Sequence, residues 1–164
     1  MRYTSLSLVL IGVFCAPISV MAQTGSTGKS DTNMEILKEK LNADKKLLIA
    51  GNMNLSEAEA KQFWPLYNSY QTELARLNDR LGRLIATYAQ GYDQGQGQIT
   101  DKMAKELLDE SLVLDEAEAK MRRTYADKLE KVLPATKTAR YMQLESKIRA
   151  LLRFELAQQI PLVY

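Results

Sequence analysis

The stretch FWPLYNSYQTELARLNDRLGRLIATY, residues 63–88, carries the pattern that decides the fold. Its apolar residues recur at alternating steps of four and three, which keeps them within one narrow stripe of a helix. A stripe of this kind is buried against another helix. The sequence therefore predicts an all-α fold in which other helices cover one seam. The seam consists of Phe63, Tyr67, Tyr70, Leu74, Leu77, Leu81, Leu84 and Tyr88.

A second long helix with the same spacing follows. It is predicted over Asp101–Leu133 with Thr100 as its N-cap, whereas the first long helix is predicted over Glu57–Ala89. A glycine-rich turn at Gly91–Gln98 joins them. Helices of equal length with a short link predict an antiparallel hairpin. The seam of the second helix is Ala104, Leu107, Ser111, Leu114, Glu118, Met121, Tyr125, Leu129 and Val132.

The start of the first long helix combines a cap with an internal proline. Ser56 and Glu59 match a capping box. Pro65 lies within the helical pattern, removes a backbone donor and is expected to kink the helix near residues 61–63. The expected architecture is thus four helices built on a long hairpin that is kinked at Pro65.

Shorter helices flank the hairpin. One is predicted over Met34–Ala50 and ends at Gly51-Asn52. The other begins with Pro134 in its first turn and ends near Gln159. Its apolar face is expected to consist of Tyr141, Leu144, Ile148, Leu151 and Leu152. The single helical domain spans residues 33–160. The tail, residues 161–164, is expected to dock on the hairpin, with a C-terminal ligand for a peptide-binding domain as the alternative.

Residues 1–22 match a secretory signal peptide. Arg2 precedes the apolar run Leu6–Phe14, and Val20-Met21-Ala22 is a small-x-small cleavage site. We expect cleavage after Ala22, a periplasmic mature protein without an integral membrane span, and a flexible leader over residues 23–32. A retained anchor and a lipoprotein acylated at Cys15 are the alternatives.

The mature composition excludes several classes of chemistry. Cleavage removes the only cysteine, and the chain contains no histidine. Disulfides, thiol nucleophiles, imidazole catalysis and the usual zinc, copper and haem ligand sets are therefore absent, and no cofactor or metal is expected. Without Arg2 the chain has 21 basic against 20 acidic residues, which argues against nucleic acid as a partner. No spacing demanded by a known reaction remains, so an enzyme is not expected.

Charge is nevertheless unevenly distributed. Residues 101–118 contain seven acids and two bases, whereas residues 119–153 contain ten bases and three acids. This half is either an ordinary solvated surface, with pairs such as Glu145 with Arg149, or a basic surface that attracts acidic chains. On the seam, Glu118 is expected either at an open edge or paired with an arginine such as Arg80, because an unpaired buried carboxylate costs several kcal/mol.

Five residues are candidates for binding a client or partner. Phe63, Trp64 and Tyr67 concentrate aromatic surface at the proline, and Trp64 either packs against the first or last helix or contributes to an exposed patch. Arg140 and Lys147 flank the apolar face of the last helix and are candidate electrostatic attractors.

An exported helical chain of this design resembles the Spy/CpxP-like periplasmic family, which carries LTxxQ motifs at the starts of two helices. The corresponding stretches are Leu55-Ser56-Glu57-Ala58-Glu59 and Leu133-Pro134-Ala135-Thr136-Lys137. Ser56 and Pro134 replace the threonines, and Glu59 and Lys137 replace the glutamines. The resemblance implies an ATP-independent chaperone with a basic, apolar-lined cradle, or a regulator of an envelope-stress sensor. Metal sensing by histidines is not implied for a chain without histidine.

We therefore expect a periplasmic protein, monomeric or homodimeric, that binds unfolded or partner proteins. The alternative is a structural envelope protein that associates with its own copies and has no client.

Overall fold

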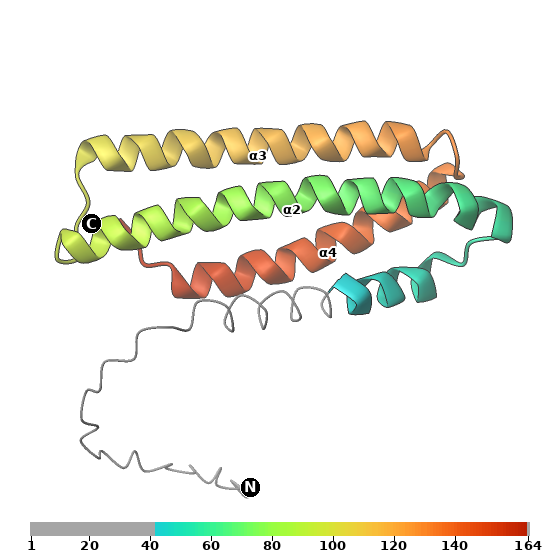
Figure 1. Cartoon of the computed structure of the whole chain (residues 1–164), viewed down its shortest axis with the longest axis horizontal. Helices are drawn as coiled ribbons and strands as arrows, with labels where there is room; N and C mark the ends of the chain where they lie inside the picture. The colour runs from blue at the N-terminus through green and yellow to red at the C-terminus, as the bar shows by residue number, and fades with distance from the viewer. Residues whose placement is uncertain (1–41, 164) are drawn as a thin grey trace, which may run out of the picture. The chain divides into compact units, whose positions relative to one another are not determined.

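The computed structural model describes residues 42–163. Within this range the chain is all-α: a helical segment at residues 42–53 precedes α2 (Glu57–Gln94), α3 (Asp101–Leu129) and α4 (Ala135–Gln159). The long helices α2 and α3 form the predicted antiparallel hairpin, and α4 runs back along it (Figure 1). The predicted signal peptide, leader and first part of the first helix lie outside the described residues.

The core is concentrated at one end of the hairpin. Here the 42–53 segment, the start of α2, the end of α3 and the start of α4 supply the buried side chains. Tyr141 of α4 is at the centre, with its ring 5.2 Å from Phe63 and 5.8 Å from Tyr70. Such edge-on aromatic contacts add to the stabilisation from apolar burial. The core comprises Ile49, Met53, Phe63, Tyr67, Tyr70, Leu74, Met121, Tyr125, Leu129, Leu133 and Tyr141.

The predicted starts of α2 and α3 are confirmed. The Ser56 amide donates to the Glu59 carboxylate at 2.7 Å, and the Glu59 amide donates to the Ser56 hydroxyl at 3.3 Å. Thr100 caps α3 by accepting from the Met103 amide. Pro65 lies inside α2, and the first turns of α2 bend in Figure 1.

Three predicted helix ends were wrong. The first helical segment continues to residue 53, because Met53 is buried in the core and Asn54 adopts the left-handed φ of 45° at the end. Helix α2 continues through Gly91 to Gln94, where Met103 packs against the glycine. Helix α3 ends at Leu129, and a turn then buries Leu133. The hairpin helices are thus unequal, with 38 and 29 residues.

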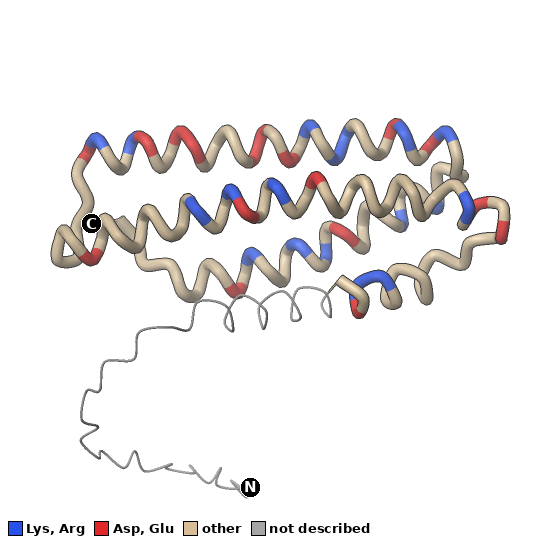
Figure 2. Tube along the Cα trace, viewed as in Figure 1, with Lys and Arg blue, Asp and Glu red and all other residues tan. Residues whose placement is uncertain are grey.

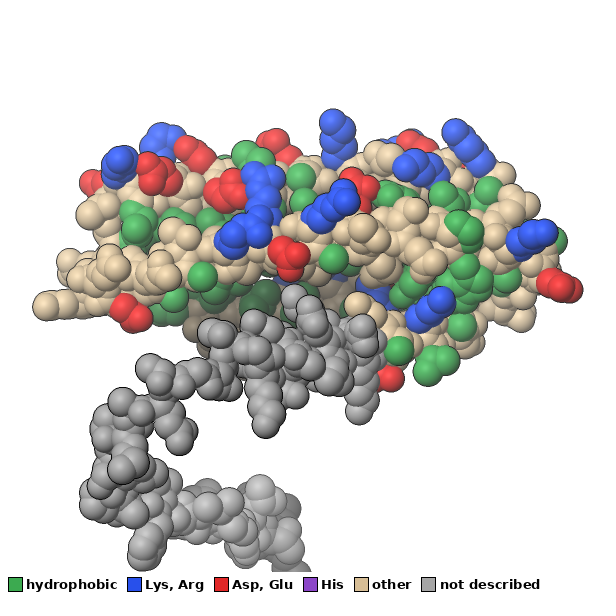
Figure 3. Space-filling model, in the orientation of Figure 1, with side chains coloured by type: hydrophobic (Ala, Val, Ile, Leu, Met, Phe, Trp, Pro, Cys, Tyr) green, Lys and Arg blue, Asp and Glu red, His purple; other side chains and the backbone are tan. Residues whose placement is uncertain are grey.

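The second half of α4 differs from the expected apolar face. Tyr141 is buried, but Leu151 and Leu152 are 69% and 44% exposed. The tail touches the hairpin where the Tyr88 hydroxyl donates to the Pro161 carbonyl at 3.0 Å, whereas Leu162 and Val163 are exposed. Hydrophobic side chains also reach the surface between charged ones on the face drawn in Figure 3. No helix within residues 42–163 combines the length and apolarity needed to cross a membrane.

Two glycines in α2 provide a matched test of its packing. A Cβ at Gly82 would meet no atom within 4 Å, whereas a Cβ at Gly91 would lie 2.2 Å from the Met103 sulfur. Gly82→Ala should raise the free energy of unfolding by about 1 kcal/mol through helix propensity, and Gly91→Ala should lower it because of the clash. Urea denaturation followed by circular dichroism measures both. Equal stabilisation by the two substitutions would contradict the Gly91–Met103 contact.

Buried tyrosines predict sensitivity to alkali. Burial raises the pKa of Tyr67 to about 12 and also raises the pKa of Tyr70, Tyr125 and Tyr141. An unfolded tyrosine titrates near pH 10, so above that pH the unfolded chain loses protons that the folded chain retains. The free energy of unfolding should therefore be unaffected by these groups at neutral pH and fall as the pH rises from about 10 towards 12. Urea denaturation at stepped pH measures this, and tyrosinate absorbance of the folded protein showing all tyrosines ionised near pH 10 would contradict it.

Candidate functional site

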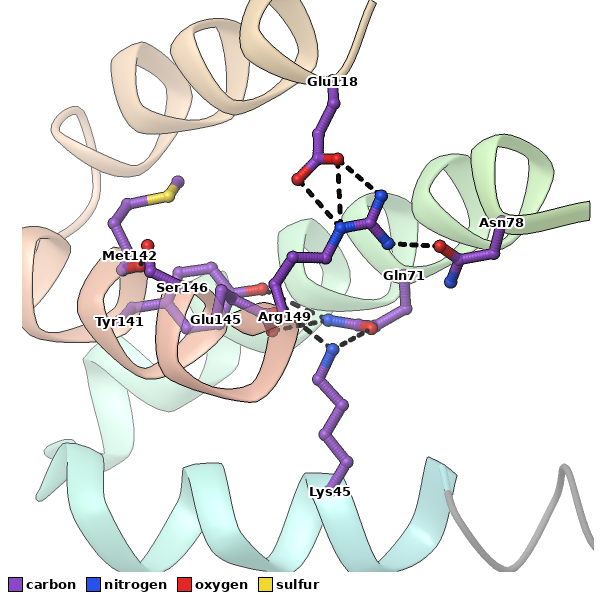
Figure 4. Close-up of polar contacts among 9 residues, drawn as sticks. All are labelled: Lys45, Gln71, Asn78, Glu118, Tyr141, Met142, Glu145, Ser146 and Arg149. Carbon is purple, nitrogen blue, oxygen red and sulfur yellow. Dashed lines mark hydrogen bonds and ion pairs between the residues drawn. The ribbon is translucent and has the colours of Figure 1, made fainter. Parts of the chain in front are cut away.

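A buried carboxylate on α4 ties the first helical segment to the bundle. Glu145 is 4% exposed, and its two oxygens accept from Lys45 Nζ at 2.7 Å and from Gln71 Nε2 at 2.8 Å. Lys45 Nζ also donates to Gln71 Oε1 at 2.8 Å, which closes a three-residue network (Figure 4). The network satisfies both carboxylate oxygens, as a buried charge requires. The sequence-based pairing of Glu145 with Arg149 was wrong, because Lys45 takes this carboxylate.

A second buried carboxylate joins α3 to α4. Glu118 is 7% exposed and accepts from Arg149, whose Nε lies 3.0 Å from both carboxylate oxygens. Arg149 Nη1 also donates to Asn78 of α2 (Figure 4). At the edge, Arg153 Nη2 donates to Glu118 at 2.9 Å and to Asp115 at 2.7 Å. Glu118 is thus paired with arginine, which was one of the two expectations for this residue.

The expected partner of Glu118 was wrong. Arg80 instead makes a two-point contact with Glu110 at 2.6 and 2.8 Å, about two turns closer to the start of α3. This pair is partly exposed, and its hydrogen bonds lower the pKa of Glu110. Arg80 therefore forms a partly exposed pair with Glu110, and Arg149 forms a buried pair with Glu118.

The aromatic candidates lie in or against the core. Phe63 and Tyr67 are 0% and 4% exposed, so neither presents a surface to a client. Trp64 is half-buried, its ring packs edge-on at 5.0 Å from Phe63 and 5.3 Å from Tyr67, and Lys46 Nζ lies 5.1 Å from its centroid. Of the two interpretations of Trp64, the structure shows packing against the first helical segment.

The two basic candidates lie on the outer side of α4. Arg140 and Lys147 are both exposed and are separated by two helical turns. Arg140 Nη1 approaches the Asn52 carbonyl at 3.5 Å, next to the end of the first helical segment. The structure therefore does not bring the five candidates into one site: three aromatics belong to the core region, and two bases belong to an open helix face.

That open face contains apolar residues that the sequence analysis either missed or assigned to the apolar face of the helix. Leu151 and Phe154 are 69% and 61% exposed, and Leu144 is half-buried. Together with the two bases they follow alternating steps of four and three along α4, which places them on one side of the helix. The spacing was present in the sequence, but its mixed polarity hid it. We call this set the α4 stripe: Arg140, Leu144, Lys147, Leu151 and Phe154.

Three of the ten bases in residues 119–153 pair with acids from elsewhere in the fold. Arg149 and Arg153 pair with acids of α3, and Lys137 Nζ lies 2.6 Å from Glu59. Among the described residues, Arg140 and Lys147 have no acidic partner. Figure 2 shows the basic positions along α4. The positive charge that remains on this helix is therefore concentrated on the α4 stripe. Within residues 42–163, no group of three or more acidic side chains is arranged to hold a metal ion.

Breaking the buried Glu118–Arg149 pair should destabilise the fold, whereas replacing both residues by apolar ones should be tolerated. Arg149→Met should lower the free energy of unfolding by about 3 kcal/mol, because it removes the principal partner of a buried carboxylate. The double variant Glu118→Met/Arg149→Met should recover most of that loss. Arg80→Met removes one partner of a partly exposed, solvent-screened pair and should lower the free energy of unfolding far less than Arg149→Met does. Urea denaturation of the four proteins measures these differences, and equal effects of Arg149→Met and Arg80→Met would contradict the burial of the pair.

Comparisons with known proteins add no information on function, so the proposal below is based on the geometry described above. No family model matches the chain, and neither the curated proteins nor the solved structures contain a match to it.

Proposed function

We propose that this chain is an exported, ATP-independent binding protein for unfolded or partner proteins, and that the α4 stripe is its contact surface. The observation that supports the proposal is the alternation of exposed basic and apolar side chains along one side of α4. The resemblance to the Spy/CpxP-like family favours the same kind of activity and the periplasm as its location.

The two kinds of side chain have separate roles in this proposal. Arg140 and Lys147 carry positive charge without an acidic partner among the described residues, so they attract acidic segments over a distance set by the salt concentration. Leu151 and Phe154 then provide apolar contact area once a client has arrived. A client that is both acidic and rich in exposed apolar residues fits this surface best.

The second candidate is self-association through the same stripe. Steps of four and three are the spacing of a coiled-coil seam, so a second copy could bury Leu144, Leu151 and Phe154. The bases oppose an arrangement in which two copies place their α4 stripes face to face, because like charges would meet. This electrostatic argument favours a client over a second copy.

The test is aggregation of an acidic model protein that unfolds when its disulfides are reduced, measured by light scattering without ATP. The mature chain from Gln23 should suppress aggregation at equimolar amounts, and suppression should weaken at high salt. The charge swap Arg140→Glu/Lys147→Glu should raise the amount needed by about fivefold at low salt and reduce the salt dependence. Leu151→Ser/Phe154→Ser should weaken suppression at every salt concentration.

Matched controls separate the stripe from general surface properties. Lys120→Glu/Lys131→Glu makes the same change in net charge at exposed positions outside α4, and Leu108→Ser/Leu112→Ser removes two apolar residues that are 58% and 53% exposed on α3. Both control variants should suppress aggregation like the parent. Suppression unchanged by the α4 variants would refute the contact surface. A mass that doubles with concentration and is restored to monomer by Leu151→Ser/Phe154→Ser, without client protection, would establish self-association instead.

A further inference from the structure

A groove runs between α2, α3 and α4 on the side of α4 that faces the hairpin. Its volume is about 240 Å³. It begins next to the Glu118–Arg149 pair and extends towards the end of α4, where the Tyr88–Pro161 hydrogen bond holds the tail against α2. At one end the lining is charged, and along the rest it is aliphatic. The groove and the α4 stripe occupy opposite sides of α4, because the groove-lining positions lie about half a turn from the stripe.

The aliphatic wall comes from all three helices. On α2 three residues spaced four apart lie along one side over about 12 Å, at 1.5 Å per residue. Leu114 of α3, Leu156 of α4 and Ile160, which directly follows α4, complete the wall. The hairpin seam continues here, but α4 diverges from α3 towards the end of α4 (Figure 1), and the α2 residues of the wall are half-buried. The wall comprises Leu77, Leu81, Ile85, Leu114, Leu156 and Ile160.

The charged end of the groove, taken together with the hollow beside it, has one more arginine than carboxylates. Arg149 and Arg153 line the groove together with Asp115 and Glu118, and Arg122 lines the adjoining surface hollow that shares these four residues. The groove is thus lined by two arginines and two carboxylates, and the hollow beside it adds a third arginine. Arg122 Nη2 donates to the Ser146 hydroxyl at 2.6 Å, and Arg122 forms no ion pair with a carboxylate among the described residues. A negative group is the complement of this end.

Arg153 is the arginine that can accept a further partner. Arg149 already donates hydrogen bonds to Glu118 through Nε and Nη2 and to Asn78 through Nη1. The hydrogen bonds that Arg153 makes within the described part of the chain use Nη2, and its side chain is 50% exposed. Its Nε and Nη1 groups lie on different edges of the guanidinium, so an incoming carboxylate can accept a single charge-assisted hydrogen bond from one of them.

We propose that this groove binds a single-chain amphiphile that carries a terminal carboxylate, such as a medium-chain fatty acid. The alkyl chain lies along the aliphatic wall, and the carboxylate binds Arg153. The length of the wall limits the chain to a medium length, because further methylene groups would extend past the tail into water. This site does not depend on the client surface, since it uses none of the residues of the α4 stripe.

The probe is sodium decanoate below its micelle concentration, titrated into the mature chain by isothermal calorimetry. Binding should be saturable with one site. Across hexanoate, octanoate and decanoate the affinity should rise about fourfold for each added methylene group, and it should level off for longer chains. Decyltrimethylammonium, which has a similar chain and the opposite charge, should bind at least tenfold more weakly than decanoate. Absence of saturable decanoate binding, or equal affinity for the cationic amphiphile, would overturn the proposal.

Two variants test the two ends of the groove separately. Arg153→Gln should weaken decanoate binding about tenfold and leave decanol binding unchanged, whereas Arg123→Gln, at an exposed arginine of α3, should change neither. Ala157→Leu fills the groove without touching a charge and should abolish binding of both ligands, whereas Ala86→Leu, at an exposed position of α2 outside the groove, should have no effect. Circular dichroism confirms that each variant is folded. Normal decanoate binding by folded Ala157→Leu would show that the ligand occupies another place.

Discussion

The buried ion pair between Glu118 and Arg149 determines how α4 lies on the hairpin. A carboxylate on a helical seam cannot be left dry and unpaired, so its partner must reach it from a neighbouring helix. Arg149 does so from α4 and also binds Asn78 of α2, which connects all three long helices at one point. Glu118 and Arg149 also line the charged end of the groove, which opens directly beside the pair.

The features that could be predicted from the sequence follow from local rules. The heptad steps placed Phe63, Tyr67, Tyr70 and Leu74 on a buried seam, and both N-caps were identified from residue type and spacing alone. Helix C-termini were less predictable, because burial of Met53 and of Gly91 by Met103 extends two helices past their glycines. A glycine ends a helix only when no packing interaction makes continuation more favourable.

Ion-pair partners were beyond the reach of sequence reasoning. Spacing along one helix suggested Glu145 with Arg149, and proximity on the hairpin suggested Glu118 with Arg80. Glu145 instead pairs with Lys45 of another helix, at a sequence separation of 100 residues, and Glu118 pairs with Arg149 of α4 and not with an arginine of α2, at a separation of 31. Only the rotation and register of the packed helices decide such pairs. The same limitation affected the candidate site: charge counting identified a basic half, but which bases stay without acids depends on those distant partners.

The two sides of α4 differ in how their apolar residues are used. On the inner side, Leu156 and Ile160 line a groove whose charged end already contains a satisfied ion pair, so the vacant space there has defined chemistry and size. On the outer side, Leu151 and Phe154 have no enclosing wall and gain from any apolar partner that their neighbouring bases attract. An enclosed site selects its ligand by shape, whereas an open stripe tolerates many sequences. The second half of α4 is apolar on both sides. This is consistent with a selective contact in the groove on its inner side and a permissive contact along the α4 stripe on its outer side.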